Sequence, residues 1–255
     1  MKYLFWMELR RSLLQMRRYP IETTLSFLIL SGMFFGIAYG TDAAFGTPQP
    51  AGQVATLTVL SFMGWMLCMN LLSGPAAEIE AESQSGTVEQ LFTGGLSVQR
   101  ILLARMFAGV VVTGSIVGVI VLLVGRLAAV DLSAQALAAV ALALVTAAGA
   151  GFVLAGVALL FKKTRALVLL ATFGLMPVMI ADGAATWIGA SSATLLLPFV
   201  GPMGLAKAVV LDSTTWSWGA FCVALGASLA YFVIGFALFG RMRLRAMRRA
   251  TIGHY

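Results

Sequence analysis

Charged residues and histidine are scarce in this chain. Only 11% of its 255 residues are Asp, Glu, Lys or Arg, whereas soluble globular domains carry about 25%. The single histidine, His254, lies outside every apolar run, which argues against a histidine metal centre and against a Ser–His catalytic pair. No G-x-x-x-x-G-K-S/T phosphate loop occurs, so we expect no ATP site, no other cofactor and no enzymatic activity of its own.

The long apolar runs also lack charged residues at their centres. The four aspartates all lie near the ends of these runs: Asp42, Asp131, Asp182 and Asp212. Ion-coupled carriers commonly need a central residue that titrates or coordinates the ion, so its absence weighs against a secondary carrier. Cys68 and Cys222 lie inside apolar runs, where we expect buried small side chains rather than a disulfide.

Hydrophobic residues make up 60% of the chain. Because a helix that crosses a bilayer needs about 20 such residues, the sequence predicts an all-α polytopic membrane protein with six transmembrane helices in one domain, residues 1–255. The predicted spans cover approximately residues 22–41, 53–77, 101–124, 132–161, 166–185 and 218–239. Small residues let helices approach closely in lipid, so we expect the Gly-rich fourth span to be internal and tightly packed.

Two further segments are predicted to stay at the membrane surface. Within residues 1–20, one apolar stripe recurs at helical spacing: Trp6, Leu9, Leu13 and Met16. With arginines on its other face and Pro20 ending it, this segment fits an interfacial helix, and a plain basic tail is the alternative. Residues 187–216 hold an apolar stretch that is too short to cross a bilayer, which favours a re-entrant or interfacial hairpin on the outer face.

Lys and Arg are unevenly distributed among the connecting segments. Fifteen of the 17 basic residues lie in four connecting or terminal segments: residues 1–20, 100–105, 162–165 and 241–249. The connecting segments that alternate with these hold only Arg126 and Lys207. Basic residues accumulate in cytoplasmic loops, so both termini are predicted to be cytoplasmic. This topology accounts for the net charge of +7 without a nucleic-acid partner.

One face of the second predicted span is rich in methionine and aromatic side chains and ends in an amide. Its residues are Phe62, Met66, Met69 and Asn70. Methionine adapts to apolar ligands, and a polar side chain in a span bonds a neighbouring helix or lines a path. This face is therefore a candidate translocation path, with simple helix packing as the alternative.

The polar segment 78–97 follows that span and holds four of the ten acidic residues, Glu78, Glu80, Glu82 and Glu89. Thr87 and Gln90 form a capping-box pattern, and Gly94–Gly95 is typical of a helix end. Between them, Val88, Leu91 and Phe92 recur on one apolar face. We expect a helix of about two turns at the membrane surface, with Glu89 in its first turn. An ordinary acidic loop is the alternative.

The run Gly86-Thr87-Val88-Glu89-Gln90-Leu91, with glutamates before it and a new span after it, resembles the membrane subunits of ABC-2 type transporters. In that family this segment is the coupling helix, which docks into the ATPase subunit. Residues 1–20 match the family's elbow helix, and residues 187–216 match its outer-face hairpin. The resemblance assigns the following residues to the ATPase interface: Gly86, Thr87, Val88, Glu89, Gln90, Leu91 and Phe92.

The resemblance implies a permease subunit of an ATP-driven exporter in the bacterial cytoplasmic membrane. A separate ABC ATPase subunit would bind ATP and Mg²⁺, and a second permease subunit, identical or different, would complete the assembly. The substrate would be lipophilic, amphipathic or lipid-linked. Two other functions stay open at this point: a secondary carrier or channel without an ATPase, and a membrane assembly protein that transports nothing.

Overall fold

The computed structural model describes residues 2–21, 24–25, 28–29, 31–33, 51–85, 97–128, 132–161, 164–180, 192–212 and 216–248. These residues form helices and contain no strand, which confirms the all-α prediction for this part of the chain. The helices are α1 (Lys2–Arg18), α3 (Ala51–Gln84), α5 (Val98–Ala128), α6 (Ala134–Leu160), α7 (Arg165–Ile180), the 3-10 helix η1 (Ser192–Leu196), α9 (Val200–Leu211) and α10 (Trp218–Arg248).

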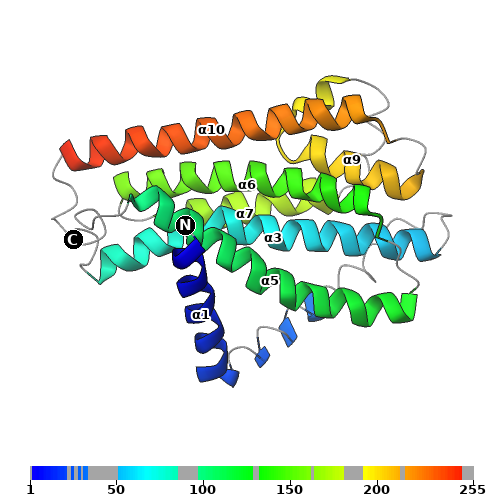
Figure 1. Ribbon diagram of the computed structural model, residues 1–255, viewed down its shortest axis with the longest axis horizontal. Helices are drawn as coiled ribbons and strands as arrows, with labels where there is room; N and C mark the ends of the chain where they lie inside the picture. Colours follow the sequence, from blue (N-terminus) through cyan, green and yellow to red (C-terminus); the bar gives the residue numbers. More distant parts are fainter. Residues whose placement is uncertain are drawn as a thin grey trace.

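Helices α3, α5, α6, α7 and α10 run along one common direction, and α1 crosses that direction toward one end of the molecule (Figure 1). The C-terminal ends of α3 and α10 lie at the same end as α1, whereas η1 and α9 lie at the opposite end. Helices α3, α5, α6 and α10 are long and apolar enough to cross a membrane. The prediction of a membrane protein is thus supported by four candidate spans among the described residues.

Helix α6 packs against both α3 and α10 and lies at the centre of the core. Its Gly149 meets Gly235 of α10 so closely that a side chain on either residue would collide with the backbone of the other helix. Gly151 lies equally close to the Leu71 carbonyl of α3. In a regular helix, the N–H of residue 75 would donate to this Leu71 carbonyl, but proline has no N–H. The Leu71 carbonyl therefore lacks its usual helical donor. The predicted tight packing of the fourth span is confirmed.

Several boundaries and burial predictions are corrected by the structure. Helix α3 does not end near Ala77 but continues to Gln84, because its last residues, AEIEAESQ, include the strong helix formers Ala, Glu and Gln. Glu78, Glu80 and Glu82 therefore belong to α3 rather than to a separate segment. Cys68 is buried as expected, but Cys222 is exposed on α10. Most of the predicted first span lies outside the described residues.

Within the predicted hairpin, residues 192–211 fold as η1 and the short helix α9, which packs against α6 and α3. The sequence pattern predicts Lys207 in a connecting segment, yet this lysine lies inside α9 with a relative exposure of only 1%. The apolar residues around it (VGPMGLAKAVVL) allow α9 to sit in the core. A buried cation therefore exists where the hydropathy pattern indicated none.

Helix α1 forms as predicted and ends at Arg18, just before Pro20. Its orientation adds a feature that the apolar stripe did not indicate. Trp6 and Leu13 of the stripe are exposed, whereas Glu8 on the opposite face is largely covered and points toward α5. The polar face of α1 is thus turned partly into the protein.

Candidate functional site

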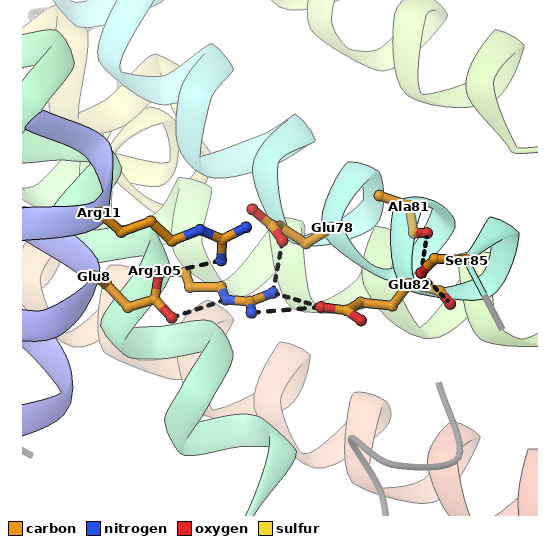
Figure 2. A network of polar contacts seen from close by, with 7 residues as sticks. All are labelled: Glu8, Arg11, Glu78, Ala81, Glu82, Ser85 and Arg105. Carbon is orange, nitrogen blue, oxygen red and sulfur yellow. Dashed lines mark hydrogen bonds and ion pairs between the residues drawn. The ribbon is translucent and has the colours of Figure 1, made fainter. Parts of the chain in front are cut away.

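A single arginine joins three helices at the end of the molecule where α1 crosses the bundle. Arg105 lies near the start of α5, and its guanidinium is surrounded by carboxylates from α1 and α3 (Figure 2). We call Arg105, Glu8, Glu78 and Glu82 the charged junction. These residues lie up to 97 positions apart in the sequence, so the junction exists only in the folded protein.

The three carboxylates surround the guanidinium, and Glu78 and Glu82 share Nη1. Arg105 Nε donates to Glu8 Oε1 at 3.2 Å, and Nη1 donates to Glu78 Oε2 at 2.6 Å. Glu82 Oε1 accepts from Nη1 at 3.4 Å and from Nη2 at 3.5 Å. Charge-assisted bonds of this kind are shorter and stronger than neutral ones, so the Glu78 contact is the firmest of the set.

The charged junction is partly shielded from solvent. The Arg105 side chain is 15% exposed and that of Glu8 is 19% exposed, whereas Glu82 is 23% and Glu78 38% exposed. Three carboxylates share one guanidinium, and the half-exposed Arg11 adds a second cation at 3.7 Å from Glu8. Removing one partner of a covered ion pair typically costs about 3–5 kcal/mol, because the other charges are left uncompensated. Arg105 is thus the cation that compensates the charge of all three glutamates.

A cavity of about 190 Å³ extends from the charged junction into the membrane-spanning part of the bundle. Glu8, Glu78 and Arg105 line one side of it, and Asn70 of α3 lines another. Asn70 Nδ2 donates to Thr113 Oγ1 of α5 at 3.1 Å. Polar contacts between α3 and α5 therefore occur both at the charged junction and at Asn70.

Gly109 of α5 makes the approach of Asn70 possible. A Cβ atom at Gly109 would lie only 2.7 Å from Asn70 Oδ1, which is closer than nonbonded atoms of these types pack. The glycine and the asparagine are thus a matched pair across the α3–α5 interface. The prediction that Asn70 bonds a neighbouring helix is confirmed.

The charged junction also lies next to the connection between α3 and α5. Helix α3 ends with the Ser85 hydroxyl bonded to the carbonyls of Ala81 and Glu82. Helix α5 begins where the Ser97 carbonyl accepts from Arg100 N. Residues 86–96 connect these two ends and lie outside the described residues. Arg105 joins both flanking helices within a few turns of this connection.

The predicted interface residues 86–92 all fall in that connection, so their assignment stays a prediction. Of the predicted path residues, Phe62 is buried in the core beside Trp65, with ring centroids 6.3 Å apart. Met66 and Met69 are half-buried and pack against the core. Asn70 lines the polar cavity. The four residues share one helix face, but only Asn70 is part of the candidate site.

The sequence contains a signal for the charged junction that was not used. Glu78 and Glu82 are spaced four residues apart, which places them on one face of a helix. Arg105 follows at a similar depth in the next helix, yet it was counted only as a topology marker. Among the described residues, no group of His, Cys, Asp or Glu is arranged to hold a metal ion. The contacts that the site does show are ion pairs and charge-assisted hydrogen bonds.

No family model, no curated protein and no solved structure matches this chain.

Proposed function

We propose that this chain is the permease subunit of an ABC-2 type exporter. The observation that carries the proposal is the charged junction: Arg105 ties α3 and α5, which flank residues 86–96, to α1. A partner that moves the 86–96 connection would therefore move three helices together. The resemblance of residues 86–91 to a coupling helix, the apolar spans and the crossing helix α1 all fit this function.

The proposal includes the finer topology expected from the sequence. It has six spans, with the first over residues 22–41, α1 as an interfacial elbow helix and residues 187–216 as an outer-face hairpin. Both termini lie on the cytoplasmic side of a bacterial inner membrane, because most basic residues occur at the end that carries α1. Two permease subunits assemble with two ATPase subunits, which bind ATP and Mg²⁺, and the substrate is lipophilic, amphipathic or lipid-linked.

The energy transfer rests on the coupling segment. Val88, Leu91 and Phe92 fill an apolar groove on the ATPase, and Glu89 contacts the rim of that groove. Buried aromatic anchors dominate such interfaces, whereas charged rim contacts contribute less. The charged junction then passes the displacement to the spans, because covered ion pairs hold helices in one relative position.

A secondary carrier is the second candidate, and one observation favours it. Lys207 is buried in α9 among apolar residues, and ionisable residues inside a membrane commonly mark ion or substrate pathways. In a carrier, Lys207→Met would abolish transport while the protein stayed folded. In the proposed permease, the same change would leave ATP-dependent transport in place, apart from any loss of stability.

The proposed function is tested with the full chain purified from its own membrane after chemical crosslinking. We expect an ATPase subunit to co-purify and ATP to drive transport in reconstituted vesicles. Phe92→Ala is expected to weaken ATPase binding by more than about 1 kcal/mol. Phe173→Ala on the exposed side of α7 is the matched control and is expected to have no effect. Transport driven by an ion gradient without any ATPase would contradict the proposal.

A further inference from the structure

A large apolar cavity lies away from the charged junction, between α6, α7, α10 and residues 197–200, which follow η1. Its volume is about 750 Å³, which is within the range of about 300–1,000 Å³ that is typical of ligand pockets. This space is open toward its surroundings rather than enclosed, so a ligand of matching size and polarity can enter it.

The side chains that line this cavity define the chemistry of the occupant. Among the described residues that line it, two are polar, and both hydroxyl groups are already used as donors: Tyr231 donates to the Leu196 carbonyl at 2.9 Å, and Thr146 donates to the Leu142 carbonyl at 3.2 Å. The other described lining residues are apolar or glycine. A polar ligand would lose its hydration without gaining partners, whereas a hydrocarbon chain would not.

The position of the cavity indicates where such a chain comes from. Leu170 of α7 and Ile234 of α10 line it and are 78% and 54% exposed. Helix α10 is long and apolar enough to cross a membrane, and α7 is a shorter apolar helix. Exposed leucine and isoleucine on such helices face lipid. A second protein helix would fill roughly 400 Å³ per turn at a diameter of about 10 Å, so the cavity would hold less than two turns. An acyl chain of a membrane lipid is thin enough to enter between α7 and α10.

The backbone beside the cavity is strained at one residue. Phe199, which joins η1 to α9, has φ 65° and ψ −46°, and Val200 N donates to the Pro198 carbonyl at 2.7 Å. This is a classic γ-turn, which is rare and strained, and a bulky side chain at positive φ adds to the strain. Such strain persists where the surrounding structure imposes it and is concentrated at ligand-binding sites.

The strained turn is held in place from both sides. The Tyr231 bond to Leu196 fixes η1 on α10, and Gly201 allows α9 to lie directly against the Leu195 carbonyl. Phe199 itself lines the cavity and packs against the core. We propose that the cavity between α6, α7, α10 and residues 197–200 binds one acyl chain of a membrane phospholipid and that Phe199 covers it. This inference goes beyond the proposed export function and does not depend on an ATPase partner.

Gly174 provides a direct test, because it lines the cavity and a side chain there would meet nothing within 4 Å. The full chain is reconstituted in phosphatidylethanolamine–phosphatidylglycerol vesicles that contain a phospholipid with a diazirine near the end of one acyl chain. After illumination, the labelled residues are mapped by mass spectrometry. We expect label on cavity residues such as Val178 and Leu175, and at least a threefold loss of that label in Gly174→Phe.

Gly226→Phe is the matched control, because Gly226 is also a helical glycine with open space around it and is not part of the cavity lining. It should keep the wild-type labelling. If Gly174→Phe fails to fold, Ala171→Phe fills the same cavity from the next turn of α7. Phe199→Gly, which relieves the positive φ and removes the cover, should speed exchange of the labelled lipid severalfold. Absence of cavity label in the wild type, or equal label in Gly174→Phe and Gly226→Phe, would overturn the proposal.

Discussion

Two contacts between helices in this protein are built by opposite means. At the centre, α6 and α10 meet through the backbones of Gly149 and Gly235, and the Phe152 ring of α6 lies 5.3 Å from that of Phe236 in α10. At the end that carries α1, the contact depends instead on one arginine and three carboxylates. The contact between α6 and α10 depends on shape alone. At the charged junction, a substitution can remove a charge with little change in side-chain volume. The charged junction is thus the contact that can be altered without repacking the core.

The largest effect is expected at the centre. In Gly235→Leu, the new side chain would collide with the α6 backbone, and backbone cannot move aside as a side chain can. Overpacking of a core typically costs about 1–3 kcal/mol and occasionally more, and here we expect loss of folded protein. Size-exclusion chromatography in detergent measures this. Gly226→Leu on the same helix, where nothing lies near, should fold normally, and equal behaviour of both variants would show that α6 and α10 are not in direct contact.

The next effect is expected at the charged junction. Arg105→Met keeps most of the side-chain volume but leaves Glu8, Glu78 and Glu82 without their shared cation. We expect the free energy of unfolding to fall by about 3–5 kcal/mol, measured by denaturant titration in mixed micelles.

Neutralising the carboxylates provides the control for that variant. Glu8→Gln, Glu78→Gln and Glu82→Gln together should cancel much of the loss caused by Arg105→Met, because no unpaired charge is then left. If Arg105→Met costs as much with the three glutamines as without them, the contribution of Arg105 is packing rather than charge.

A smaller effect is expected where the polar contacts enter the bundle. Gly109→Ala places a methyl group against Asn70 Oδ1, so Asn70 must rotate and lose its bond to Thr113. A hydrogen bond makes a net contribution of about 0.5–1.5 kcal/mol to stability. We expect the free energy of unfolding to fall by that amount in the same titration. Asn70→Ala combined with Gly109→Ala should cost no more than Asn70→Ala alone. Strict additivity of the two changes would contradict the pairing.

The smallest effect is expected for Arg11, which is half-exposed and lies 3.7 Å from Glu8. Exposed ion pairs contribute about 0–1 kcal/mol, so Arg11→Ala should change the free energy of unfolding by less than about 1 kcal/mol. A loss as large as that of Arg105→Met would mean that the two arginines act as one unit and that Arg105 has no special position.

The comparison also explains what the sequence could predict. Helix type, approximate spans and the tight packing at Gly149 and Gly151 follow from local patterns, because apolar length and small residues are properties of single segments. The short apolar stretch before Leu211 was also recognised as unable to cross a membrane. These predictions needed no knowledge of which helices are neighbours.

The charged junction could not be predicted in the same way, because it depends on how separate segments meet. Glu8 lies on the face of residues 1–20 opposite the apolar stripe, and Arg105 lies among the basic residues that indicate topology. Their pairing required that α1 cross the bundle at the start of α5, which no local pattern indicates. Lys207 was misplaced for a related reason: a lone lysine near the end of an apolar stretch looks exposed until its helix is packed against α6 and α3.

The central claim is that the charged junction couples the 86–96 connection to the spans, and ATP hydrolysis by the reconstituted permease–ATPase complex tests it most directly. Arg105→Gln, stabilised where needed by Glu78→Gln and Glu82→Gln, should still bind the ATPase and hydrolyse ATP. Its transport per ATP hydrolysed should fall at least fivefold, whereas Arg11→Gln should match the wild type. Unchanged transport per ATP in both variants would show that Arg105 is a structural contact without a part in coupling.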